Sequence, residues 1–217
     1  MSQTGVISPK RGLKSTLRSV IYDHTFAKLT SNWYRAVFER LPPGAFVLDV
    51  GIGTGSAIAA NADLVKKKAI TILGVDIDSD YIARCRQNLS KAGLERQVTA
   101  RLESVYDHRG GPYDAIYFSS SFMLLPDPVR ALRHVLPQLK SGGRIYFTQT
   151  FQEKKSTLVE KIKPMLHKVT TIHFGRVTYW HDFIATLEKA GAEVEEYDVL
   201  KDLKNATFRL VIAKPRE

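Results

Sequence analysis

Apolar residues recur along this chain in two alternating spacings, and the alternation predicts where helices and strands lie. Over residues 26–41 they recur every three or four positions, which is typical of an amphipathic helix, and Pro42-Pro43-Gly44 ends that helix. Shorter apolar runs predict strands, with helical spacing between them. The expected strands are 45–50, 69–76, about 98–103, 113–119 and 144–151, and the expected helices are 55–67, 80–92 and a segment from Asp127 to near Lys140.

The end of the chain follows a different pattern. Two helices are expected over 156–167 and 180–190, and two strands near 193–199 and 206–213. Only about five residues join these strands, and a connection that short can make only an antiparallel hairpin. The predicted fold class is therefore α/β: a doubly wound, Rossmann-like sheet, covered by helices on both faces and finished by an antiparallel hairpin.

Composition sets limits on the kind of protein. The chain has 217 residues, which fits one domain, and no apolar run approaches the roughly 18 residues that span a membrane. Its single cysteine excludes an internal disulfide and a cysteine-built zinc site, and no metal site is expected. A net charge of +10 favours anionic partners such as phospholipid headgroups, nucleic acid or acidic small molecules. A basic protein without a polyanion partner remains the alternative.

Residues 1–25 form a basic, serine-rich segment in which Asp23 is the first acidic residue. Such a composition is typical of a mitochondrial presequence. The segment also fits an amphipathic helix, because Leu13, Leu17 and Val20 fall at helical spacing. The two interpretations place the protein either in mitochondria or in the cytoplasm with possible association with a membrane surface.

A glycine-rich turn follows the first expected strand and opens the next helix. Gly51 permits the tight turn, Gly53 lets the backbone approach a ligand, and Gly55 allows helix and strand to pack closely. The dinucleotide fingerprint needs glycine or alanine where this chain has Ser56. Asp49 precedes the turn, and a carboxylate there suits a ligand with a positive group better than a diphosphate.

The segment Val47–Gly55 resembles motif I of class I S-adenosylmethionine-dependent methyltransferases. This resemblance covers about residues 26–213. It implies S-adenosylmethionine as the cofactor and a seven-stranded sheet of order 3-2-1-4-5-7-6, with the last strand antiparallel. It also implies that residues 26–217 form the methyltransferase domain, with an insertion over about 152–180 on the acceptor side, and that 1–25 act as a lid.

Later strand ends carry the other expected cofactor contacts. Asp76 lies 25 residues after Gly51, and an acid near that distance binds ribose hydroxyls with its two oxygens. In the family that Val47–Gly55 resembles, the next residue covers the adenine, which is Ile77 here. The resemblance also places Glu103 and Ser104 at the adenine edge, and Ser119, at the end of the fourth strand, beside the methyl group.

The resemblance also excludes some subclasses. No Asn-Pro-Pro-Tyr motif of nucleobase amino methyltransferases follows the fourth strand, and no aspartate stands there for the metal of catechol-type enzymes. Cys85 lies on the helix expected over 80–92, which is the wrong place for the cysteine that attacks cytosine covalently in cytosine methyltransferases.

Two clusters could contact the methyl acceptor, together with Ser120 after the fourth strand. Tyr22, Asp23 and His24 resemble a Tyr-Asp pair that closes over the cofactor in quinone and phospholipid methyltransferases. His24 and Tyr22 are the candidate catalytic residues, since the pKa of histidine lies near neutrality. The alternative is that Asp23 only begins a helix.

The second cluster lies in the insertion and the helix after it. Its members are His173, Tyr179, Trp180 and His181. Aromatic side chains there could enclose an apolar or cationic acceptor. The alternative is ordinary packing of the two tail helices.

These observations favour methyl transfer to nitrogen or oxygen of a small-molecule or lipid-like acceptor, with a phospholipid amine or an isoprenoid quinol preferred. An RNA or protein acceptor is the first alternative, and nucleic acid stays open as a partner. A protein that binds the cofactor without catalysis is the second alternative.

Overall fold

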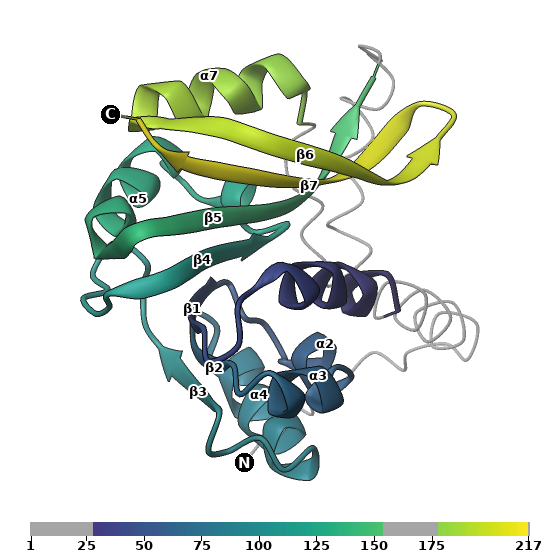
Figure 1. Cartoon of the computed structure of the whole chain (residues 1–217), viewed down its shortest axis with the longest axis vertical. Helices are drawn as coiled ribbons and strands as arrows, with labels where there is room; N and C mark the ends of the chain where they lie inside the picture. Colours follow the sequence, from purple (N-terminus) through teal and green to yellow (C-terminus); the bar gives the residue numbers. More distant parts are fainter. Residues whose placement is uncertain (1–27, 154–177, 217) are drawn as a thin grey trace, which may run out of the picture.

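The computed structural model describes residues 28–153 and 178–216, and within them the chain builds one seven-stranded sheet (Figure 1). The strands follow the order β3-β2-β1-β4-β5-β7-β6, which confirms the predicted order and fold class. Strands β1 to β5 pair in parallel, and β7 pairs antiparallel with both β5 and β6. The strands are β1 Phe46–Val50, β2 Thr71–Asp76, β3 Val98–Leu102, β4 Tyr113–Ser119, β5 Leu139–Gln152, β6 Ala192–Leu203 and β7 Ala206–Pro215.

Helices cover both faces of the sheet and enclose two apolar cores (Figure 1). The first helix, described over residues 28–40, packs with α2, α3 and α4 on one face. α5 and α7 cover the other face. The helices are α2 Ser56–Ala59, α3 Ala62–Lys67, α4 Ser79–Lys91, α5 Pro128–Val135 and α7 Trp180–Ala190, with 3-10 turns η1 Phe122–Leu124 and η2 Leu136–Gln138. None of these helices is long and apolar enough to cross a membrane.

The helix expected over 55–67 is divided into α2 and α3. Asn61, which is almost fully buried between them, donates from its side chain to the Ala57 carbonyl at 2.8 Å. Its own backbone N–H bonds to Ile58 instead, so the α-helical ladder ends at this point.

Strand β5 begins five residues before the expected strand at 144. Leu139 already pairs with Tyr113, and the pairing register then shifts between Tyr113 and Ala115. The segment Gly142-Gly143, just before the expected strand, therefore lies inside an irregular strand, where Gly142 has φ 76°.

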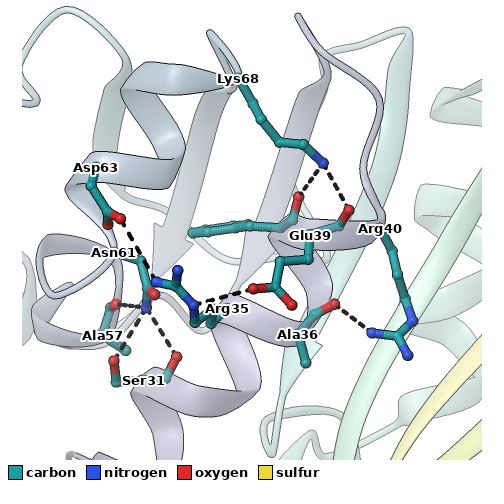
Figure 2. A network of polar contacts seen from close by, with 10 residues as sticks. Ser31, Arg35, Ala36, Glu39, Arg40, Ala57, Asn61, Asp63 and Lys68 are labelled. Atoms are coloured by element: carbon teal, nitrogen blue, oxygen red, sulfur yellow. Dashed lines mark hydrogen bonds and ion pairs between the residues drawn. The ribbon is translucent and has the colours of Figure 1, made fainter.

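Polar contacts fasten the first helix to α2 and α3 (Figure 2). The Asn61 side chain also donates to the carbonyl and the hydroxyl of Ser31, at 2.9 and 3.2 Å. Lys68 donates to three carbonyls where the first helix ends, those of Phe38, Glu39 and Leu41. A cation at this end also complements the helix dipole, so the helix is held at both ends.

Candidate functional site

The glycine-rich turn after β1 adopts left-handed conformations at three positions. Gly51, Gly53 and Gly55 have φ of 82°, 57° and 63°. A Cβ on Gly51 would lie 2.7 Å from Ser121 Cβ, and one on Gly55 would lie 2.5 Å from Cys85 Sγ. Nothing lies within 4 Å of the same point on Gly53. Gly51 and Gly55 are therefore required by packing, whereas Gly53 leaves its backbone open to a ligand.

Asp49, directly before the turn, is a buried carboxylate with one held oxygen. The Tyr34 hydroxyl donates to its Oδ2 at 2.8 Å, while Oδ1 is buried without a hydrogen-bond partner among the described residues. Burial raises the pKa of Asp49 to about 7; the Tyr34 hydrogen bond opposes this rise and nearby Asp76 adds to it. An orphaned buried oxygen of this kind fits the ammonium of an amino-acid ligand.

Asp76, at the end of β2, is tied to the turn. Its Oδ2 accepts from the Gly53 N–H at 2.9 Å and its Oδ1 from the Asp78 N–H at 3.0 Å. Each oxygen keeps a second lone pair, which suits two ribose hydroxyls. Ile77, the next residue, has 78% of its surface exposed, as a platform for an apolar ring would.

Glu103 and Ser104 follow β3 beside Asp76. The Glu103 N–H donates to the Asp76 carbonyl at 2.9 Å, so the two expected contacts lie on adjacent strand ends. The Ser104 hydroxyl accepts from the Tyr106 N–H at 3.2 Å and takes part in the turn that follows. The side chain of Glu103 is the better placed of the two for a ligand.

Three serines end β4 and join it to its neighbours. Ser120 has φ 54°, which is uncommon for a residue other than glycine, and its N–H donates to the Thr148 carbonyl at 2.8 Å. The Ser119 hydroxyl accepts from that of Thr148 at 3.5 Å, and Ser121 Oγ donates to the Val50 carbonyl. A left-handed residue held by β5 and flanked by hydroxyls makes this strand end a candidate functional position.

The structure brings the nine cofactor candidates to one edge of the sheet, and the acceptor candidate Ser120 lies next to Ser119 there. The cofactor candidates lie at or near the ends of β1, β2, β3 and β4, at the carboxyl edge where doubly wound folds bind ligands. They are Asp49, Gly51, Gly53, Gly55, Asp76, Ile77, Glu103, Ser104 and Ser119. Tyr22, Asp23, His24 and His173 lie outside the described residues.

The aromatic cluster at the start of α7 is filled by its own chain. The Trp180 ring lies 5.2 Å from that of Phe151 and 6.1 Å from that of Phe183, and the Arg209 guanidinium lies 4.7 Å from its centroid. Tyr179 stacks on His181 at 5.8 Å. These contacts are those of packing on the α7 face, and the acceptor role of Tyr179, Trp180 and His181 stays a prediction.

Two residues of the first helix that the sequence did not single out lie near the candidate site. Tyr34 holds Asp49, and Trp33 packs edge-on against Phe208 of β7 with its indole N–H buried and unpartnered in the described part of the chain. Tyr34, Val37, Phe38 and Leu41 are all buried, and this apolar stripe is the signal that identifies Tyr34 as a core-facing residue.

The sheet order, the hairpin and the two carboxylates around an open glycine turn define a class I S-adenosylmethionine-dependent methyltransferase. Within residues 28–153 and 178–216, no group of three or more histidine, cysteine or acidic side chains is placed to hold a metal ion. The methyltransferase domain family matches residues 42–198, and the chain belongs to that family.

Several curated proteins are similar to this chain. A phosphatidylethanolamine N-methyltransferase of Cereibacter sphaeroides is 24% identical over 83% of this chain and 84% of its own length. A protein-L-isoaspartate O-methyltransferase 2 of Polaromonas sp. is 32% identical over 56% of this chain and 54% of its own. A ubiquinone biosynthesis O-methyltransferase of Pseudomonas putida is 28% identical over 63% and 56%. The chain thus spans most of the first protein and about half of the other two.

Solved structures share the fold at low identity. The [4+2]-cyclase SpnF has a TM-score of 0.69 at 19% identity, covering 88% of this chain and 82% of its own. A Geobacter sulfurreducens S-adenosylmethionine-dependent methyltransferase in complex with S-adenosylhomocysteine has a TM-score of 0.63 at 13%, covering 86% and 90%. Because the chain belongs to the methyltransferase domain family it is a methyltransferase, which contradicts the non-catalytic alternative. The Geobacter sulfurreducens protein of the same fold binds S-adenosylhomocysteine.

Proposed function

We propose that this methyltransferase acts on a nitrogen or oxygen of a small, lipid-like molecule, with a phospholipid amine or a quinol preferred. The similarity to the phosphatidylethanolamine N-methyltransferase carries the proposal, because among the three curated proteins described above it spans more than four fifths of both chains, whereas the other two match little more than half. The similarity to a ubiquinone biosynthesis O-methyltransferase supports the quinol as the other preferred acceptor. The net charge of +10 also suits an anionic lipid surface.

The cofactor site supplies positioning and charge. When bound, S-adenosylmethionine supplies a methyl group already activated on a positively charged sulfur. Asp49 would hold the ammonium, Asp76 the ribose hydroxyls, and Ile77 the adenine face. Fixed contacts at three points orient the donor for an in-line displacement, which is the main contribution an enzyme makes to this reaction.

The acceptor would approach from the end of β4. Ser119 and Ser120 lie where a polar group of the acceptor can be oriented, and the Trp33–Phe208 pair offers an apolar wall between the first helix and β7. We assign removal of a proton to His24 and Tyr22, and an acceptor contact to Asp23. The remaining acceptor contacts are assigned to His173, Tyr179, Trp180 and His181.

The test is transfer of radiolabelled methyl groups to defined acceptors. Vesicles of phosphatidylethanolamine with anionic lipid, a soluble hydroquinone, total RNA and total protein are offered separately to the purified chain. We expect label in the lipid or quinol extract, and none with the Asp76→Ala variant as control. Label confined to RNA or protein contradicts the proposal, as does failure of the chain to bind the vesicles at low salt.

A protein acceptor is the second candidate. The relative that acts on L-isoaspartate in proteins is the most identical of the three, although it matches only about half of either chain. If the acceptor is a protein, label should enter the protein fraction, and the amount of label should increase when the substrate proteins are aged. An RNA acceptor would instead show binding that weakens steeply as salt rises.

A further inference from the structure

The loop between β3 and β4 encloses a histidine that the methyltransferase chemistry does not use. His108 has no exposed surface. Its Nδ1 lies 3.1 Å from Glu103 Oε1, and its Nε2 lies 2.8 Å from the Tyr113 hydroxyl. A buried imidazole with both nitrogens engaged joins the start of β4 to the side chain at the end of β3.

The direction of these hydrogen bonds follows from their partners. A carboxylate can only accept, so Nδ1 carries the proton that His108 donates to Glu103. Burial raises the pKa of Tyr113, so its hydroxyl keeps its proton and donates to the lone pair on Nε2. The hydrogen bonds therefore run in one direction, from the Tyr113 hydroxyl to His108 Nε2 and from His108 Nδ1–H to Glu103. They hold the imidazole in the tautomer that is protonated on Nδ1.

The backbone of the loop is shaped around this contact. The Ser104 carbonyl accepts from the N–H groups of Asp107 and His108, both at 3.0 Å, which turns the chain back toward Glu103. A Cβ on Gly110 would lie 2.3 Å from the Tyr113 hydroxyl and 3.1 Å from His108 Nε2. Only glycine fits at this position without displacing the hydrogen bond.

A second contact fixes the histidine from the other side. The His108 carbonyl accepts from His134 Nε2 at 2.7 Å and from Gln138 Nε2 at 3.1 Å. His134 therefore anchors this loop to α5. It contacts the His108 carbonyl and not its ring, which makes it a matched control for the experiment below.

The end of this chain of contacts lies in the cofactor site. Glu103 is hydrogen-bonded through its backbone to Asp76, the residue before the exposed Ile77. Its side chain stays 24% exposed, so a ligand can reach the carboxylate whose Oε1 His108 holds. The adenine of the donor carries one amino group, which is the donor that a carboxylate at this edge can accept from.

We propose that Tyr113 and His108 are positioning residues that fix the Glu103 carboxylate as the acceptor for the adenine amino group, and so give the cofactor site its selectivity for adenine. The proposal rests on the cofactor site and does not depend on the acceptor. Its distinguishing consequence is a preference for adenine over hypoxanthine, which carries an oxygen in place of that amino group.

The test compares two ligands by titration calorimetry: S-adenosylhomocysteine and S-inosylhomocysteine. We expect the wild-type chain to bind the adenine ligand about 10- to 100-fold more tightly, as for a hydrogen bond to a charged group. Glu103→Gln, whose amide both donates and accepts, reduces that ratio to about one. Tyr113→Phe and His108→Gln reduce it about threefold or more, because the carboxylate is less firmly held.

Tyr113→Phe is the decisive variant, because it keeps the ring and its 4.7 Å contact with Phe46. The control His134→Leu lowers the melting temperature but leaves the ligand ratio unchanged. An unchanged ratio in Tyr113→Phe and His108→Gln, whatever happens to absolute affinity, overturns the proposal, as does a wild-type chain without preference. A wild-type chain that binds neither ligand overturns the cofactor site itself.

Discussion

The hydroxyl of Tyr34 lies 2.8 Å from Oδ2 of Asp49, so a helix that precedes the sheet supplies a hydrogen bond to the carboxylate beside the glycine turn. The Tyr34 ring also lies edge-on to that of Tyr117, 4.9 Å between centroids, which fixes the hydroxyl in place. The first helix therefore contributes a hydrogen bond to the candidate cofactor site.

Replacing Tyr34 by Phe removes this hydroxyl and keeps the ring packing. A buried carboxylate then loses its donor, so we expect cofactor affinity to fall about tenfold or more. Because the hydrogen bond lowers the pKa of Asp49, its loss moves that pKa above 7. Calorimetric titration with S-adenosylhomocysteine at several pH values measures both effects. Unchanged affinity and an unchanged midpoint would show that Tyr34 only fills space.

Cofactor binding should depend on pH through Asp49. Its pKa is about 7 in the folded chain against an ordinary value of 3.8, so the folded state retains a proton between about pH 4 and 7 that the unfolded state has lost. Through this group the ligand-free protein loses stability as pH rises across that window. A bound ammonium favours the charged carboxylate, so affinity should rise with pH up to about 7 and then level.

The proton released on binding can be counted. Calorimetry in two buffers of different ionisation enthalpy should show release near pH 6 and almost none near pH 8.5. Asp49→Asn, which cannot titrate, serves as the control and should bind weakly without this buffer dependence. Equal release at both pH values would contradict the assignment.

Two glycines of the same turn should respond differently to alanine. Gly53→Ala meets no atom of the chain, so stability falls only by the cost of a left-handed alanine, about 1–2 kcal/mol. Cofactor binding should be nearly abolished, since the new methyl group fills the space left for the ligand.

Gly55→Ala places its Cβ against Cys85 Sγ and should mainly lower stability. Thermal unfolding measures the loss, about 1–3 kcal/mol beyond the backbone strain, as for overpacking. The double variant Gly55→Ala, Cys85→Ala removes the sulfur and should recover part of it. A double variant as unstable as the sum of the two single variants would indicate that the contact does not matter.

The fastening of the first helix predicts an effect at a distance. Asn61→Ala removes three hydrogen bonds made by a buried amide and should destabilise the chain by about 2–3 kcal/mol in urea unfolding. Arg35, in the same network, makes exposed ion pairs with Glu39 and Asp63 (Figure 2), and Arg35→Ala should cost under about 1 kcal/mol. Equal losses in the two variants would refute this ranking.

The sequence predicted the strands and the helices between them because these depend on the local spacing of apolar residues. Asp49, the glycine turn and Asp76 could be recognised because each stands at the end of an apolar run. The sheet order was implied by the family that Val47–Gly55 resembles, and the structure confirms it. The antiparallel hairpin followed from connection length alone, and β6 and β7 confirm it.

What the sequence could not predict depends on contacts between distant segments. Tyr34 was missed because its partner lies on another element, and nothing local distinguishes it from a core tyrosine. The division of α2 from α3 arises from Asn61, whose partners include Ser31 on the first helix. The burial of His108 could not be predicted either, because it depends on Tyr113 and on His134 of α5.

The sulfur beneath Gly55 belongs to the only cysteine of the chain, and it has no exposed surface. Burial also raises the pKa of the Cys85 thiol to about 12, so the reactive thiolate is almost absent in the folded protein at neutral pH. A thiol reagent can therefore modify the protein only when the contact between α4 and the glycine turn opens. A ligand that binds only the closed form reduces the population of the open form by mass action. The rate at which Cys85 is modified therefore falls as the cofactor site fills, and it measures cofactor occupancy without any knowledge of the methyl acceptor.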